Sequence, residues 1–337
     1  MTTILLSRTD SIGDVVLTLP LAGWLKERLP QCRIVFLCAA YTQAIVESSA
    51  HVDKVVNWNA LEKLPEYEQI RQLQALTIDT IIHVFPRPAI ARLAQKAGIP
   101  ERIGTRNRLY HWLTCNHLVP LSRKNSPLHE AELNFGLISP ITDSPSPPLR
   151  NIPRYYGLTR LPDLPEHLGD VLDSARFNLI IHPKSQGSAP EWQEERYKQL
   201  CHLLPAERFN IIVTGTEAEG KQIQHLRQEV VNFGGHDLTG ATTLAELLAL
   251  LAHADGLLAS STGPLHVASA LGKNTLGLFA PIRPMHPARW QPIGTKATVL
   301  SLEKNCRACT GRKPCACIDA LTPEAVATVI QSWLEPQ

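Results

Sequence analysis

The sequence predicts an α/β protein made of two doubly wound domains. Short apolar runs alternate with helical patterns along most of the chain, which is typical of right-handed βαβ units on a parallel sheet. The alternation lapses between residues 140 and 165, where seven prolines crowd the sequence. A length of 337 residues also exceeds what one core usually organises. We therefore expect an N-terminal domain over residues 1–160, a second domain over 161–321, and a closing helix over 322–337 that packs back on the first domain.

The N-terminal half contains five expected strands and four helical patterns. The first helical pattern includes Pro20, which has no N–H to donate to residue 16 and must kink or restart the helix. The strands are expected over residues 3–7, 33–38, 55–56, 80–84 and 102–104. The helices are expected over residues 15–28, 42–48, 62–76 and 89–97.

Beyond the prolines the same alternation resumes. Thr322 precedes the last helical pattern, where its hydroxyl suits the N-cap position. The strands are expected over residues 178–182, 210–214, 256–259 and 275–279. The helices are expected over residues 194–204, 217–230, 244–252, from 264 onward, and 323–333.

Composition excludes several classes of protein. The chain is 44% apolar and 19% charged with a net charge of +2, which argues against disorder and against a nucleic-acid-binding protein. It has neither a secretory signal core nor an apolar run near the ~20 residues of a membrane span. A cytoplasmic location is the expectation, and a pI near 8.1 allows peripheral contact with an anionic membrane surface.

The stretch over residues 259–272 has the features of an anion site. A buried run ends in Ser261, Thr262 and Gly263, and Pro264 then opens a helical pattern. Small residues at this turn leave the free N–H groups of the helix open to a ligand, and phosphate is the usual occupant.

The turn after the first expected strand, over residues 8–14, also carries polar residues. Gly13 permits a tight turn, and Asp14 enters the first turn of a helix. Two interpretations of Asp14 stay open: a helix-capping acid, or a general base held over a cleft. Arg8 has two candidate partners as well, a phosphate or Asp10.

Two further turns in the second domain have the same strand-to-helix setting. Lys184 and Ser185 lie in a loop that either lines a phosphate or ribose pocket or is an ordinary surface loop. Glu219 either accepts from ribose hydroxyls or is a solvated acid in a first helical turn. No G-x-G-x-x-G and no P-loop pattern occurs, which weakens the dehydrogenase and P-loop interpretations.

The eight cysteines form two sets. Four are scattered in apolar surroundings and are expected to be buried: Cys32, Cys38, Cys115 and Cys201. The other four lie within twelve residues and either hold a structural zinc ion or are unliganded, oxidisable thiols: Cys306, Cys309, Cys315 and Cys317.

Four segments together carry a resemblance to a known family. They are residues 11–20, 102–104, 129–134, and 261–272 with the Leu-Phe pair that follows at 278–279. On these motifs the chain resembles glycosyltransferase family nine, the bacterial heptosyltransferases that build the inner core of lipopolysaccharide.

The resemblance implies a GT-B fold, in which two Rossmann-like domains face each other across a cleft. It implies an inverting transfer of heptose from ADP-heptose to a lipopolysaccharide-core acceptor at the inner face of the membrane, with no cofactor or divalent metal required. Asp14 matches the family's base, and Arg8 matches a basic residue near the phosphates. Thr242 falls where the family contacts the nucleotide base, and Glu219 where it contacts the ribose. The candidate donor-binding residues are Ser11, Gly13, Lys184, Ser185, Glu219, Thr242, Ser261, Thr262, Gly263 and His266.

The chain departs from the family pattern at two places. Ser261 stands where the family commonly has aspartate, and Glu191 precedes Trp192 where many members have lysine. Lys184 is one candidate replacement for that lysine; the others are Arg283, His286 and Arg289. Two alternatives therefore stay open, another nucleotide-sugar donor and a non-catalytic nucleotide-sugar-binding protein. The cysteine cluster leaves a third, a redox-sensing or zinc-dependent module.

Overall fold

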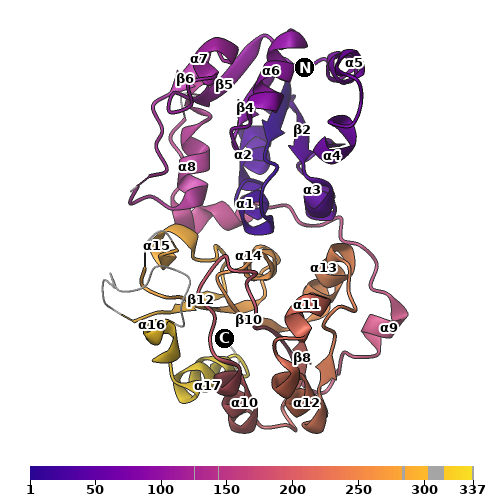
Figure 1. Cartoon of the computed structure of the whole chain (residues 1–337), viewed down its shortest axis with the longest axis vertical. Helices are drawn as coiled ribbons and strands as arrows, with labels where there is room; N and C mark the ends of the chain where they lie inside the picture. Colours follow the sequence, from indigo (N-terminus) through magenta and orange to yellow (C-terminus); the bar gives the residue numbers. More distant parts are fainter. Residues whose placement is uncertain (125, 143, 283–284, 303–314, 336–337) are drawn as a thin grey trace. The chain divides into compact units, whose positions relative to one another are not determined.

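Two parallel six-stranded sheets organise the chain, each with helices packed around it. Figure 1 shows the computed structural model, which describes residues 1–124, 126–142, 144–282, 285–302 and 315–335. The chain divides into two compact units, Met1–Arg160 and Leu161–Gln337.

The sheet of the first unit has the strand order β3-β2-β1-β4-β5-β6, with every neighbouring pair parallel. Its strands are β1 (Thr3–Ser7), β2 (Arg33–Cys38), β3 (Lys54–Asn57), β4 (Thr80–His83), β5 (Glu101–Thr105) and β6 (His117–Val119). Its helices are α1 (Ile12–Val16), α2 (Pro20–Arg28), α3 (Gln43–Glu47), α4 (Trp58–Leu61), α5 (Glu66–Ala75), α6 (Pro88–Lys96), α7 (His111–Thr114) and α8 (Glu130–Gly136). Three 3₁₀ helices complete the unit: η1 (Ala40–Thr42), η2 (Ser139–Ile141) and η3 (Leu149–Tyr155).

The sheet of the second unit has the order β12-β11-β10-β7-β8-β9, again with every neighbouring pair parallel. Its strands are β7 (Phe177–His182), β8 (Phe209–Val213), β9 (His236–Asp237), β10 (Gly256–Ser260), β11 (Asn274–Leu278) and β12 (Ala297–Leu300). Its helices are α9 (Glu166–Gly169), α10 (Glu194–Leu203), α11 (Glu217–Gly220), α12 (Gln224–Asn232), α13 (Leu244–His253), α14 (Gly263–Ala270), α15 (Pro287–Trp290), α16 (Ala316–Asp319) and α17 (Pro323–Ser332).

The two sheets share one topology. Counted from the first strand of each unit, both read 3-2-1-4-5-6, the order of a doubly wound dinucleotide-binding sheet. In such sheets ligands bind outside the carboxyl ends of the strands, where the strand order reverses. That point lies between β1 and β4 in the first unit and between β7 and β10 in the second.

Prolines decide several helix boundaries. The helix expected over residues 15–28 ends at Val16 and restarts at Pro20, as the missing N–H requires. The helix expected over 62–76 is confirmed as α5 but begins later, at Glu66, with Pro65 at its N-cap. The proline-rich connection is more ordered than expected: Tyr155 of η3 is buried, and its carbonyl lies so close to Gly23 of α2 that a Cβ there would clash.

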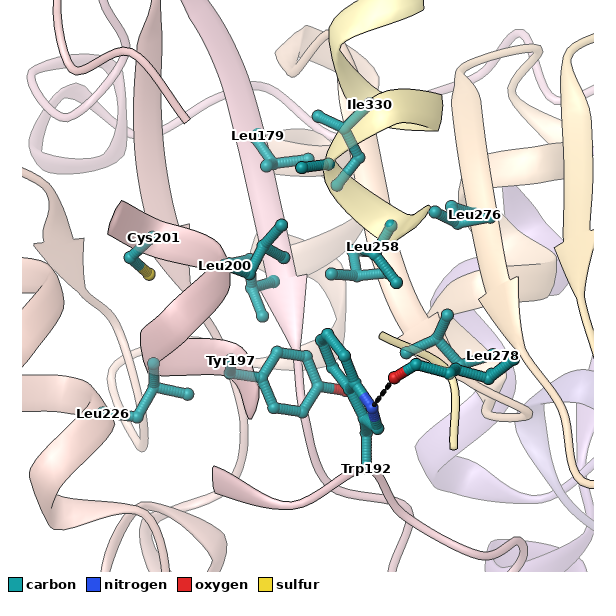
Figure 2. Close-up of a cluster of buried hydrophobic side chains, with 14 of the residues drawn as sticks. Leu179, Trp192, Tyr197, Leu200, Cys201, Leu226, Leu258, Leu276, Leu278 and Ile330 are labelled. Atoms are coloured by element: carbon teal, nitrogen blue, oxygen red, sulfur yellow. Dashed lines mark hydrogen bonds between the residues drawn. The ribbon is translucent and has the colours of Figure 1, made fainter. Parts of the chain in front are cut away.

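The closing helix α17 packs in the second unit. Its residues Val326, Ala327 and Ile330 are buried in that unit's core, where Ile330 lies over the sheet near Leu179 (Figure 2). In the same core the Trp192 indole donates to the carbonyl of Leu321 at 3.0 Å. The expectation that this helix also packs back on the N-terminal domain stays a prediction. Thr322 caps the helix as expected, accepting from the Ala325 N–H.

The carboxyl end of β4 carries a fully buried histidine, His83. Its ring stacks on His111 with centroids 5.4 Å apart, and neither ring nitrogen hydrogen-bonds to any residue that the structure describes. Burial, and then the nearby His111 and Arg102, lower the pKa of His83 to about 3. His83 is therefore neutral in the folded protein at ordinary pH.

This histidine predicts an acid-side loss of stability. Between about pH 6.5 and 3 the unfolded chain binds a proton at His83 that the folded chain does not. The free energy of unfolding therefore decreases as the pH is lowered through this range. The slope from this group is at most about 1.4 kcal/mol per pH unit. We expect His83→Leu to flatten the decline in melting temperature between pH 7 and 5, whereas the same change at exposed His225 leaves it unaltered. An H83L profile parallel to wild type would contradict this.

Among the described helices, none combines the length and the hydropathy needed to cross a bilayer.

Candidate active site

The turn after β1 holds a carboxylate at the reversal point of the first sheet. Asp14 lies in the first turn of α1, where its carboxylate is partly buried. One carboxylate oxygen, Oδ1, pairs with the guanidinium of Arg8, and the other, Oδ2, accepts from the hydroxyl of exposed Ser11. Gly13 beside it is buried. The carboxylate is thus held in one orientation with its Oδ2 side toward solvent.

Arg8 itself is buried, with only 2% of its surface exposed. All three guanidinium nitrogens are engaged: Nε with Asp10 at 2.7 Å, Nη2 with Asp14, and Nη1 with Glu130 at 3.2 Å. Of the two partners expected for Arg8, Asp10 is therefore the one observed. Its burial and its three carboxylate partners favour a positioning role for Arg8, and its assignment as a catalytic residue near the phosphates stays a prediction.

The far side of Arg8 is held by helix α8, which sequence reasoning left without a role. Glu130 and Asn134 lie one helical turn apart, so both face Arg8. Arg123 also donates to both of them, at 2.8 Å in each case. The i, i+4 spacing of the two polar residues was the available signal, although it does not reveal a partner more than 120 residues away.

The cluster has two fixed positive charges, Arg8 and Arg123, and three acidic groups, Asp10, Asp14 and Glu130. Burial raises the pKa of Asp10 to about 6, although the positive charge of Arg8 lowers it in part. For Arg8, burial works against the charged form, but the neighbouring carboxylates outweigh it and raise the pKa of its guanidinium. Counted with all three carboxyl groups ionised, the cluster has a formal charge of −1.

In the second unit, three neighbouring strands end in polar turns that hydrogen-bond to one another. After β7 and β8, His182 Nδ1 lies 3.0 Å from the hydroxyl of Thr214. After β7 and β10, the Ser188 hydroxyl donates to the carbonyl of Ser261 at 3.2 Å. Burial lowers the pKa of His182, so its ring is neutral here. The order β10-β7-β8 thus brings the predicted donor-site turns to one edge of the sheet.

The loop after β7 is folded around Glu191. This carboxylate pairs with the Nζ of Lys184 and accepts from the backbone N–H of Ser185 at 2.7 Å. The Ser185 side chain is buried and bonds within the loop, to Glu191 and to the Ala189 carbonyl. Lys184 therefore carries its charge at this edge of the sheet, in an ion pair with the acid that precedes Trp192.

The turn after β10 has the features of an anion site. Helix α14 begins at Gly263, one residue before Pro264, with Thr262 at the N-cap. Thr262 is buried, and its hydroxyl has no hydrogen-bond partner among the described residues and caps no helix N–H. The N-terminus of α14 therefore keeps its donors available, as phosphate binding requires.

The remaining candidates lie around this edge. Glu219 is buried, not solvated, and its carboxylate closes a capping box with the N–H and hydroxyl of Thr216. Thr242 is half-buried in the segment after β9, which is joined to the β8 turn by the Gly240 N–H bonding to Gly215 at 2.8 Å. His266 is a core residue of α14.

The other candidates are placed only in part. Cys306, Cys309 and Arg283 lie outside the described residues, whereas Cys315 and Cys317 are buried. The zinc site thus stays a prediction. His286 caps α15 by accepting from the Ala288 N–H at 3.1 Å. The four scattered cysteines are buried, as expected.

Comparison with known proteins identifies the family. The sequence profile of glycosyltransferase family 9 (heptosyltransferase) matches residues 68–317. The chain belongs to this family. It is therefore a glycosyltransferase of the heptosyltransferase family. The lipopolysaccharide core heptosyltransferase OpsX of Haemophilus influenzae is 23% identical over 300 residues, covering 87% of this chain and 83% of that protein. Lipopolysaccharide heptosyltransferase 2 of Escherichia coli is 23% identical over 313 residues, covering 86% and 85%.

Solved structures confirm the expected GT-B fold of this family 9 chain. E. coli ADP-heptose lipopolysaccharide heptosyltransferase II superposes with a TM-score of 0.77 at 20% identity, covering 99% of this chain and 98% of that one. The E. coli heptosyltransferase WaaC with ADP gives a TM-score of 0.72 at 19% identity, covering 98% and 100%.

Proposed function

We propose that this family 9 chain transfers heptose from ADP-heptose to a lipopolysaccharide-core acceptor, with inversion and without a metal cofactor. The observation that carries the proposal is the oriented carboxylate of Asp14 at the reversal point of the first sheet. The acceptor is lipid-linked, so the reaction belongs at the cytoplasmic face of the inner membrane.

In this mechanism Asp14 is the general base. Its Oδ2 side, bonded to exposed Ser11, takes the proton of an acceptor hydroxyl. The acceptor oxygen then attacks the anomeric carbon from the face opposite the diphosphate, and the bond between that carbon and the diphosphate oxygen breaks. The electron pair leaves with ADP. In this proposal Arg8 acts by holding Oδ1 of Asp14.

The leaving diphosphate is stabilised by the turn after β10. The free N–H groups at the start of α14 and the Thr262 hydroxyl supply donors where negative charge develops. Lys184 adds a positive charge at the same edge of the sheet. The buried Glu219, held by Thr216, is the candidate for the ribose hydroxyls.

The direct test is a transfer assay with purified full-length protein, ADP-heptose and a truncated core acceptor, following ADP release and product mass. UDP- and GDP-sugars run in parallel test the alternative donors that Ser261 leaves open. Transfer from ADP-heptose is the expected result. Donor binding without turnover on any acceptor would contradict the proposal and favour a nucleotide-sugar-binding protein.

Thr262 gives a sharper test of the donor site. We expect Thr262→Val to raise the Kd for ADP about tenfold or more, because it removes a donor to a charged phosphate. Folding stability should not fall, since the hydroxyl has no described partner to lose. The matched control is Thr275→Val, which removes from β11 another buried hydroxyl that has no hydrogen-bond partner among the described residues. Equal ADP affinity in T262V and T275V would contradict the assignment.

A further inference from the structure

An exposed apolar cluster lies on the first unit, outside the site described above. The described part of the chain has ten exposed large hydrophobic side chains, and three of them fall between residues 109 and 113. They are Leu109, Trp112 and Leu113, which are 87%, 60% and 79% exposed. We call these three residues the α7 cluster. Apolar side chains gathered this closely on a surface mark an interaction site.

The α7 cluster is presented on a fixed backbone. His111, between its members, is buried and bonds through Nδ1 to the Thr105 carbonyl at 2.9 Å. The Trp112 indole N–H donates to the Arg106 carbonyl at 2.9 Å, so the polar edge of the ring is satisfied within the protein. The Leu113 carbonyl accepts from Gln95 of α6 at 2.7 Å. The cluster is therefore built to face outward.

The charge around the α7 cluster is positive. Residues 102–129 contain four arginines, one lysine, and no aspartate or glutamate. Two of the arginines are Arg106 and Arg108. Arg106 and Arg108 are exposed and form no ion pair with any residue that the structure describes. The other arginines of this stretch are used internally: Arg102 bonds backbone carbonyls and Arg123 pairs with Glu130. Two free cations thus flank the apolar side chains.

We propose that the α7 cluster, with Arg106 and Arg108, docks the protein on an anionic lipid bilayer. Leucine and tryptophan side chains enter the boundary between headgroups and acyl chains, while guanidinium groups meet lipid phosphates. A protein partner would need an acidic surface that matches these arginines, whereas the headgroups of an anionic bilayer are negatively charged throughout. The proposal extends the proposed function, because a lipid-linked acceptor is presented at such a surface.

Helix α7 lies alongside β5 and returns toward the amino end of that strand. The Leu113 carbonyl accepts from Gln95 near the end of α6, and Arg102 at the start of β5 donates to the Thr114 carbonyl at 2.8 Å. The cluster is therefore separate from the turn that carries Asp14 after β1. None of the docking residues belongs to the Arg8–Asp14 cluster or to the donor site.

The test is sedimentation of the full-length protein with vesicles of 3:1 phosphatidylethanolamine and phosphatidylglycerol, and with phosphatidylcholine alone. We expect wild type to bind the anionic vesicles and to be released as salt rises from 0.1 to 0.5 M. Changing the three cluster residues to serine should lower partitioning at least about tenfold, since each buried side chain contributes. Reversing both arginines to glutamate should lower it by about as much.

Two control variants remove an exposed ring or reverse an exposed charge elsewhere on the first unit. Tyr67→Ser removes a 72% exposed ring from α5, and Arg71→Glu reverses an exposed charge on the same helix. Neither should change vesicle binding. Melting temperature and ADP binding are measured for every variant, and both should match wild type.

Three results would overturn the docking proposal. The first is that wild type stays in the supernatant with anionic vesicles, and the second is that the cluster variants bind as wild type does. The third is a change of oligomeric state in the cluster variants with vesicle binding unchanged, which would make this face an interface between copies of the chain. The protein could also bind vesicles through the α7 cluster and yet transfer no heptose. That result would contradict the proposed function but support the docking surface.

Discussion

Replacing Asp14 by asparagine should reduce the rate of heptose transfer by about a thousandfold or more while leaving ADP binding within about twofold of wild type. Loss of a positioned general base costs about 10²–10⁴-fold in rate, and asparagine cannot take a proton. The amide keeps the size of the side chain and an oxygen for Arg8. Single-turnover transfer with saturating ADP-heptose and acceptor measures the chemical step directly.

Asp10 supplies the matched control for that experiment. It is the other carboxylate of this turn that pairs with Arg8, so Asp10→Asn disturbs the same guanidinium without removing the base. We expect a loss of less than about tenfold, since asparagine still accepts from Nε. Similar rates in D14N and D10N would mean that Asp14 only orients the cluster, and another group would have to be the base.

The sequence predicts the centre of each sheet well and its edges poorly. Strands such as β1 and β10 are buried runs of aliphatic residues, which a short apolar window reveals. The strands β6, β9 and β12 were missed. They are short and only partly buried. They are strands because each pairs with one neighbouring strand, and not because of a hydrophobic pattern in their own sequence.

The candidate site divides in the same way. Turns that follow a buried strand, such as the one that ends at Gly263, are local features, and the sequence predicted where they lie. The role of Arg8 is not local, because it depends on Glu130 and Asn134 arriving from α8. Glu219 shows the same limit: its position in a helical turn was predicted, but its burial by the surrounding fold was not.

Arg8 should also be the residue whose loss costs the first unit most stability. Removing it by Arg8→Met leaves Asp10, Asp14 and Glu130 next to one another, with Arg123 as the remaining cation that pairs with Glu130. Breaking a buried ion pair from one side costs about 3–5 kcal/mol, because the partner charge stays buried without compensation. Methionine fills most of the volume, so a cavity contributes little to this loss.

The comparison that isolates this effect uses Arg154, which also pairs with a glutamate but is 58% exposed in its side chain. Arg154→Met should leave the free energy of unfolding close to that of wild type, because an exposed ion pair contributes little to stability. If R8M is too unstable to purify, the double variant with Glu130→Gln keeps the test open, because it removes one of the uncompensated charges and should recover part of the stability. Urea unfolding followed by calorimetry of the same samples measures both losses. An R8M protein as stable as R154M would show that the carboxylates do not depend on this guanidinium, and the positioning role of Arg8 would fall with it.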